Sequence, residues 1–192
     1  MASTNTPSPF GQQIGNDIVS IIVRTGLNQK TFKVHKDLLC QKVPFFAAMF
    51  NTGFLESKTQ SATLPEDDSN SFEHFLGWLY RDSIGYIDHI DEHTLVFGFA
   101  EKYDLLHLMD LTIDSLVCKL RGDNSMLEMA RIEIMYLVTH EKSKLRELAA
   151  RCQAFVVLEL GGEEIWRSDN LLPKGPDRDQ ITIDCYRQMN VR

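Results

Sequence analysis

The clearest pattern of hydrophobic and polar positions lies in residues 31–50. Phe32 and Val34 alternate with Lys33, which is the period-two pattern of a half-buried strand. Two leucines follow in a short helix. Pro44 then suits the first turn of another helix, because its missing N–H has no partner to lose there. The apolar face of that helix holds Phe45, Phe46, Met49 and Phe50. The sequence predicts one strand and two helices here, which need the rest of the chain to bury them.

Two further strands are predicted on either side of this stretch. Residues 18–23 are nearly all β-branched and apolar, which favours a strand buried on both faces. A turn at 26–29 would return the chain as a hairpin. Residues 61–64 form a plausible third strand, which Pro65 ends. The predicted sheet is therefore small.

Helices dominate the rest of the first 122 residues. Residues 67–69 are good helix-capping residues, and the helix after them has its apolar positions at helical spacing: Phe72, Phe75, Leu76, Leu79 and Tyr80. Asp91 is predicted to cap a helix that runs to about Tyr103 with Leu95 facing inward. Another helix is predicted from about 107 to 120, with Gly122 as its left-handed C-terminal cap.

These elements resemble a known family when their residues are taken in order. The segments that carry the resemblance are Asp17-Ile18-Val19-Ser20-Ile21-Ile22-Val23, Phe32-Lys33-Val34-His35-Lys36-Asp37-Leu38-Leu39, Phe45-Phe46-Ala47-Ala48-Met49-Phe50 and Phe54-Leu55-Glu56-Ser57. Together they resemble the opening of a BTB/POZ domain, from about Asp17 to about Leu120. The resemblance implies an α+β fold, with a sheet of three or slightly more strands wrapped by helices. It also implies a function in protein–protein interaction.

The residues after the resemblance predict a helical extension and a tail. Asn124 or Ser125 is expected to cap a first helix, and a second spans about 143–160. The run from Tyr136 to Leu148 is similar to the region after the core in many short fungal BTB proteins. In the tail, Trp166 or Leu171-Leu172 is expected to pack on the body. The predicted organisation is a flexible N-terminal tail at 1–16, a BTB/POZ domain at 17–122, a helical extension at 123–162 and a mostly irregular tail at 163–192.

Composition argues against some classes of function. The net charge of −7 argues against non-specific nucleic-acid binding, which needs clustered Lys and Arg. No run of eighteen apolar residues indicates a membrane span, and no signal peptide is recognised, so a cytoplasmic or nuclear protein is expected. Cys40, Cys118 and Cys152 lie among apolar residues and are predicted to be buried, reduced thiols.

Histidines are the candidates for metal-binding or catalytic residues in this chain. His89 and His93 have helical spacing, but the predicted cap at Asp91 lies between them and no third ligand is indicated, so exposed loop histidines are expected rather than a metal site. His35 lacks a nucleophile and a supporting acid, so a structural role at a strand–helix junction is favoured. No catalytic residue and no cofactor are predicted, and the chain is not expected to be an enzyme.

The strongest candidate for a partner-binding site is Ile90-Asp91-Glu92. Some BTB adaptors carry a hydrophobic–any–Glu sequence before the equivalent helix, where it contacts a cullin scaffold of ubiquitin ligases. The alternative reading makes Ile90 a core residue and Glu92 a partner of the helix dipole. Asp17 is either a strand cap or, as the resemblance implies, a residue near the partner-facing side of a dimer. The two functional hypotheses are a cullin adaptor and a homo- or hetero-oligomerisation scaffold, such as a homodimer, with no ligase role.

Overall fold

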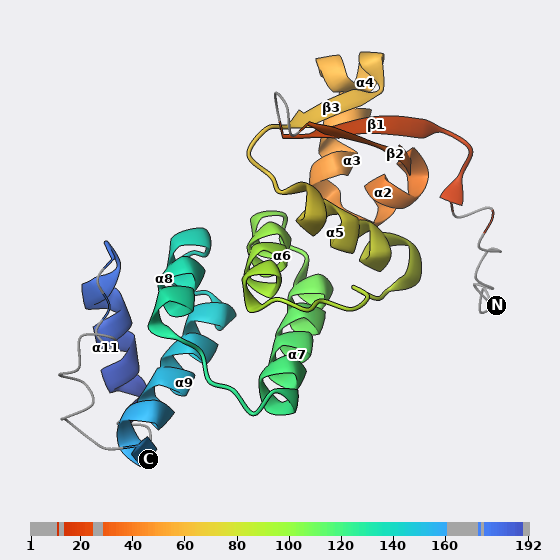
Figure 1. The fold of residues 1–192 in the computed structure, drawn as a ribbon. Coiled ribbons are helices and arrows are strands. Elements are labelled where there is room, and N and C mark those ends of the chain that lie inside the picture. Colours follow the sequence, from red (N-terminus) through yellow and green to blue (C-terminus); the bar gives the residue numbers. More distant parts are fainter. Residues whose placement is uncertain (1–10, 12–13, 25–28, 161–172, 174, 190–192) are drawn as a thin grey trace, which may run out of the picture. The chain divides into compact units, whose positions relative to one another are not determined.

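The computed structural model describes residues 11, 14–24, 29–160, 173 and 175–189. These residues belong to two compact units, Met1–Ile84 and Gly85–Arg192. The first unit holds a small sheet and its covering helices, and the secondary-structure elements described in the second unit are all helices (Figure 1). The fold is therefore α+β, as the sequence predicts. Within the described parts of the chain, no helix combines the length and apolar character needed to span a bilayer.

The sheet of the first unit has the strand order β2-β1-β3. Its strands are β1 (Ile18–Val23), β2 (Lys30–His35) and β3 (Ser61–Leu64). β2 pairs antiparallel to β1 with Val19 opposite Val34, whereas β3 pairs parallel to β1 with Ser20 opposite Ser61. All three strands lie where the sequence predicts them. The turn predicted at 26–29 lies largely outside the described residues.

The central strand β1 corrects one prediction. Val19, Ile21 and Val23 are fully buried, whereas Ile18 is exposed and the residues between them are half-buried. The strand therefore has one buried face, not two. Its run of β-branched residues reflects the stiffness that suits a strand, and this composition alone does not tell a central strand with one open face from a strand covered on both.

Helices cover the sheet of the first unit. Figure 1 shows α2, α3 and α5 gathered on one side of the sheet, and α4 beyond β3. Their bounds are α2 (Lys36–Lys42), α3 (Pro44–Asn51), α4 (Leu55–Thr59) and α5 (Ser69–Arg81). Pro44 is the first residue of α3, and Asp68 caps α5 by accepting a hydrogen bond from the Ser71 N–H at 2.9 Å, both as predicted.

Aromatic rings fill the core of this unit. Phe46 and Phe50 of α3 and Phe72 and Phe75 of α5 are among its fully buried side chains. The ring centroids of Phe46 and Phe75 are 6.3 Å apart, and those of Phe72 and Phe75 are 5.2 Å apart, which are distances of tilted aromatic packing. Phe45, which was predicted to share the apolar face, is 42% exposed. The predicted stripe is therefore core on one side and surface on the other.

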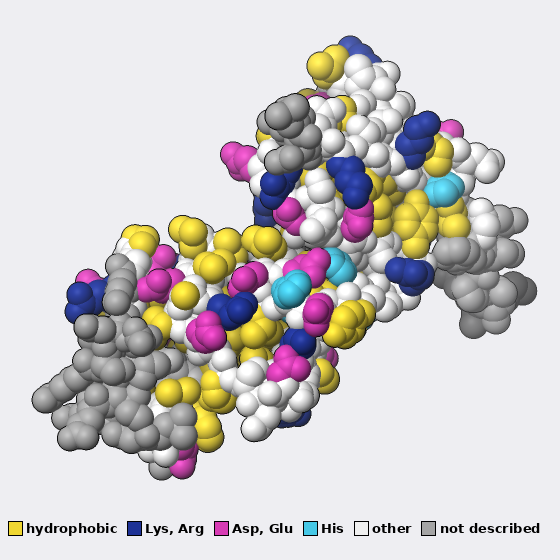
Figure 2. All heavy atoms as spheres, viewed as in Figure 1, with side chains coloured by type: hydrophobic (Ala, Val, Ile, Leu, Met, Phe, Trp, Pro, Cys, Tyr) yellow, Lys and Arg dark blue, Asp and Glu magenta, His cyan; other side chains and the backbone are white. Residues whose placement is uncertain are grey.

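The second unit is built from α6 (Ile90–Lys102), α7 (Leu106–Gly122), α8 (Met129–Val138), α9 (Lys144–Leu160) and α11 (Arg178–Met189). α6 packs on α7 and α8, and α9 packs on α8 and α11. Hydrophobic side chains also gather on the visible surface over α8 (Figure 2).

Several local predictions in this unit are wrong. α8 begins at Met129, after Glu128, and not after a cap at Asn124 or Ser125. Gly122 ends α7 as a helical residue, and the left-handed backbone conformation falls at Asn124, with φ of 47°. Leu95, predicted to face inward, is exposed.

The C-terminal residues contain a helix that the sequence did not predict. α11 lies within the stretch 163–192, which was predicted to be mostly irregular. Its buried side chains are Ile181 and Cys185, four residues apart, so the apolar stripe is only one side chain wide. Such a narrow stripe is a weak signal, and contacts with α9 and α8 stabilise the helix instead. Trp166 and Leu171-Leu172 lie outside the described residues.

Cysteine burial is lower than predicted at all three positions. Cys118 on α7 is exposed, whereas Cys40 and Cys152 are half-buried, and all four thiols are free. Cys185 is fully buried, which raises the pKa of its thiol to about 11. Because the thiolate is the reactive form, burial makes Cys185 a small apolar side chain at neutral pH.

Gln153 on α9 offers a test of this core. The side chain is 1% exposed, and within the described part of the chain neither amide atom has a hydrogen-bond partner. Leu has a similar size and nothing to desolvate, so Gln153→Leu is expected to raise the free energy of unfolding by about 1–2 kcal/mol. Urea denaturation measures the change. Exposed Gln41→Leu is the control and should change stability by less than about 0.5 kcal/mol. A less stable Gln153→Leu variant would show that the amide makes useful contacts.

Candidate partner-binding site

The first turn of α6 holds two of the predicted site residues. Helix α6 begins at Ile90, and its N-cap is His89, whose backbone carbonyl accepts hydrogen bonds from the N–H groups of Glu92 and His93. Asp91 therefore lies one residue inside the helix and is not its cap, which corrects the prediction. Acidic residues in this turn favour the helix because they face the positive end of its dipole. Ile90 and Glu92 are both partly exposed on this single turn.

The segment before α6 is held in place by ionic contacts. The Tyr86 hydroxyl donates a hydrogen bond to Asp88 at 2.9 Å, and the Lys119 ammonium lies 3.1 Å from the same carboxylate. Lys119 also lies 3.0 Å from Asp123. Hydrogen bonds from Lys119 and then Tyr86 lower the pKa of Asp88, and the bond to Asp88 raises the pKa of the Tyr86 hydroxyl. Hydrogen bonds to Asp123 and then Asp88 raise the pKa of Lys119.

His93 anchors the turn from inside and corrects a second prediction. It is fully buried, whereas the sequence suggested an exposed loop histidine. Its Nδ1 lies 2.9 Å from the His89 carbonyl oxygen, and its Nε2 lies 3.0 Å from the Ser115 hydroxyl of α7. His89 is exposed. In the described residues, no group of three or more His, Cys, Asp or Glu side chains is arranged to hold a metal ion.

Arg131 of α8 is a site residue that the sequence did not indicate. Its guanidinium lies 2.8 Å from the Asp91 carboxylate and 3.8 Å from that of Glu128. The helical extension therefore contacts the residue between Ile90 and Glu92. Forty residues separate Arg131 from Asp91, and no local pattern predicts such a pair. The turn thus contacts α7 through His93 and α8 through Arg131.

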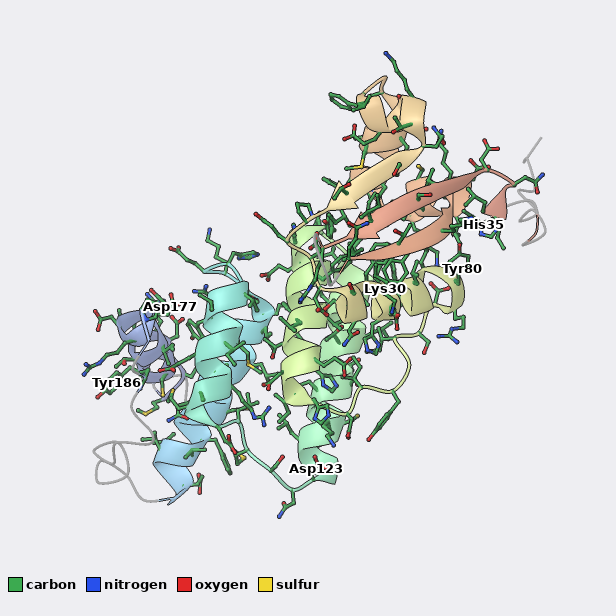
Figure 3. All side chains as sticks on the ribbon, turned by 45° about the horizontal axis from the view of Figure 1, so that its top comes forward. Lys30, His35, Tyr80, Asp123, Asp177 and Tyr186 are labelled. Carbon is green, nitrogen blue, oxygen red and sulfur yellow. The ribbon has the colours of Figure 1, made fainter. Side chains whose placement is uncertain are left out.

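His35 has a structural position. It is the last residue of β2 and the N-cap of α2. Its Nδ1 lies 2.8 Å from the Tyr80 hydroxyl of α5, and that hydroxyl oxygen also accepts a hydrogen bond from the His35 N–H at 3.1 Å. Figure 3 labels both side chains. This pair ties the strand–helix junction to α5, which is the kind of role that the sequence favours for His35.

A comparison with protein-family models identifies the family of this fold. The family model described as BTB/POZ domain matches residues 16–120, which is more than half of the chain. The chain belongs to the BTB/POZ family. BTB/POZ domains are protein-interaction domains, so the chain is a protein–protein interaction module.

Curated relatives agree with this family. TD and POZ domain-containing protein 3 from mouse is 27% identical over 140 residues, which is 71% of this chain and 36% of that protein. TD and POZ domain-containing protein 4 from mouse is 28% identical over 97 residues, which is 49% of this chain and 25% of that protein. The chain therefore spans only about a quarter to a third of the length of these relatives.

Asp17, the third predicted site residue, belongs to the first unit. It directly precedes β1 and is exposed, and its backbone carbonyl accepts a hydrogen bond from the Lys36 N–H at 2.8 Å. This contact holds the start of β1 next to the start of α2. The structure thus brings Ile90 and Glu92 together on one turn of this BTB/POZ protein, whereas Asp17 lies in the other unit. A role for Asp17 in binding a partner stays a prediction.

Proposed function

We propose that this BTB/POZ protein is an adaptor that binds the cullin scaffold of a ubiquitin ligase through the first turn of α6. The observation that supports this proposal best is the partial exposure of Ile90 and Glu92 on the same turn. An apolar side chain contributes buried contact area to an interface, and a carboxylate beside it fixes the orientation of the partner.

The rigidity of this turn also supports the proposal. Binding is weakened by the entropy lost when mobile groups are ordered. Here the turn is already held by the buried His93 and by the ion pair between Asp91 and Arg131. The segment before it is held by Asp88 and Lys119. Ordering of this turn on binding would therefore cost little entropy.

Replacing Ile90 tests the proposal. Ile90→Asp is expected to weaken capture of the chain by a purified cullin scaffold at least about tenfold, because it places a carboxylate in the apolar centre of the interface. Glu92→Ala should weaken it less. Surface plasmon resonance on the immobilised cullin measures both, with circular dichroism to verify folding.

Leu106→Asp is the matched control, because Leu106 is an exposed apolar residue at the start of α7, in the same unit. It should bind like the unaltered chain. The proposal fails if the unaltered chain does not bind, or if Ile90→Asp binds equally well. If the chain does not bind the cullin but light scattering shows that it is oligomeric, the result would favour a function as an oligomerisation scaffold. The exposed neighbours Phe54 and Leu55 support that second candidate, since contiguous exposed apolar side chains mark interaction sites.

A further inference from the structure

Helix α8 is apolar on two sides. Its inner side chains are fully or almost fully buried: Met129, Ile132, Met135 and Tyr136. On the opposite side, Ile134 is 37% exposed and Leu137 is 71% exposed. Together with the exposed Ala130, they form a stripe at the spacing i, i+4, i+7, which we call the outer stripe of α8. A helix with apolar residues on opposite sides is normally buried on both, but among the described residues nothing covers Leu137, which is 71% exposed.

A hollow lies along the outer stripe. Its volume is about 240 Å³, and its walls are Ile134, Leu137 and Glu133 of α8 and the residues Gly175, Pro176 and Asp177 before α11. The Glu133 carboxylate accepts a hydrogen bond from the Gly175 N–H at 3.0 Å, which ties the second wall to the helix. Proline restricts the backbone of that wall further. The hollow is thus preformed in the chain without a partner.

The charged residues that line the hollow are both acidic. The charged residues among its described walls are Glu133 and Asp177, and no Lys or Arg belongs to these walls. Figure 3 labels Asp177 beside the start of α11, and Figure 2 shows the hydrophobic side chains that gather over α8. An apolar floor with carboxylates at its rim complements an apolar side chain that has a cation beside it.

We propose that this hollow binds a short segment of another protein in which an apolar side chain is flanked by Lys or Arg. The hollow is smaller than the roughly 300–1,000 Å³ of typical small-molecule pockets, so it suits a protruding side chain rather than a whole cofactor. The apolar side chain covers Ile134 and Leu137, and the cation lies near Asp177. This inference does not depend on the cullin proposal, because it uses a different surface.

The experiment uses two short dye-labelled peptides with the same central Leu pair, one flanked by Lys and one by Glu. Fluorescence anisotropy with the full chain should show binding of the Lys-flanked peptide at least about tenfold tighter than that of the Glu-flanked one. Leu137→Asp should abolish this binding, whereas Leu106→Asp should leave it unchanged. Asp177→Asn removes the charge and keeps a residue suited to a helix start, and it should reduce the preference for Lys.

Three results would overturn the proposal. The first is the absence of binding by the Lys-flanked peptide, and the second is equal binding of both peptides. The third is self-association of the chain in light scattering that Leu137→Asp abolishes, because a second copy would then be the occupant of the outer stripe. Thermal unfolding of each variant shows whether the fold is retained. If Leu137→Asp does not fold, the milder Leu137→Ser replaces it, with Leu106→Ser as its control.

Discussion

Phe46→Ala is expected to lower the free energy of unfolding of the first unit by about 3–5 kcal/mol. Phe46 has no exposed surface and packs between Phe50 and Phe75, with ring centroids 6.4 Å and 6.3 Å away. Truncation removes the buried ring and leaves a cavity between α3 and α5. The surrounding rings belong to two helices and cannot collapse fully into it. Urea denaturation followed by circular dichroism measures the loss.

The neighbouring residue provides a matched control. Phe45 has the same side chain on the same helix but is 42% exposed. Its ring makes an edge contact with Phe46 at 5.2 Å, so Phe45→Ala should lower the free energy of unfolding by only about 1 kcal/mol. Equal losses at both positions would contradict the assignment of Phe46 to the core. A loss below about 1.5 kcal/mol for Phe46→Ala would do the same.

The sequence predicted the first unit well because its signals are local and strong. The alternation around Phe32 and Val34, the proline at the start of α3 and the aspartate cap of α5 each need only a few neighbouring residues. The parallel pairing of β3 with β1 was not predicted. Strand order depends on contacts between distant segments, which hydrophobic periodicity does not encode.

The candidate site was predicted only in part, for a similar reason. Ile90 and Glu92 are neighbours in the chain, so a resemblance to a short motif could locate them. Arg131 reaches Asp91 across forty residues, and the burial of His93 depends on its contact with Ser115. In the sequence, a histidine near several acidic residues is as consistent with a surface loop as with a buried position. Its burial follows from packing between helices, which a single sequence does not show.

Buried Arg146 of α9 is the second residue whose replacement is expected to have a large effect. Its guanidinium donates hydrogen bonds to the backbone carbonyls of Tyr136 and Thr139 and to the Thr139 hydroxyl. It also lies over the Tyr136 ring, 4.7 Å from its centroid. Carbonyls in the last turn of a helix lack partners within that helix. Arg146 therefore caps the C-terminal end of α8 from another helix, and its positive charge suits the negative end of the helix dipole.

The same cluster extends to the C-terminal helix. The Tyr136 hydroxyl donates a hydrogen bond to Asp184 of α11 at 3.0 Å. Burial, followed by this bond, raises the pKa of Tyr136. Arg146, Tyr136 and Asp184 thus connect α9, α8 and α11. A change at Arg146 is expected to loosen all three helices.

Arg146→Ala should lower the free energy of unfolding of the second unit by about 3 kcal/mol, because it leaves buried carbonyls without donors and removes the contact with the Tyr136 ring. Arg146→Lys should retain little of this stability, since an ammonium group cannot reproduce the planar fork of donors. Thermal and urea unfolding measure both variants. Arg151→Ala is the control on the same helix: its exposed ion pair with Glu147 and its exposed hydrogen bond to Gln188 of α11 contribute at most about 1 kcal/mol. If Arg146→Lys proves as stable as the unaltered chain, the stabilisation comes from the positive charge near the helix end and not from the fork of hydrogen bonds.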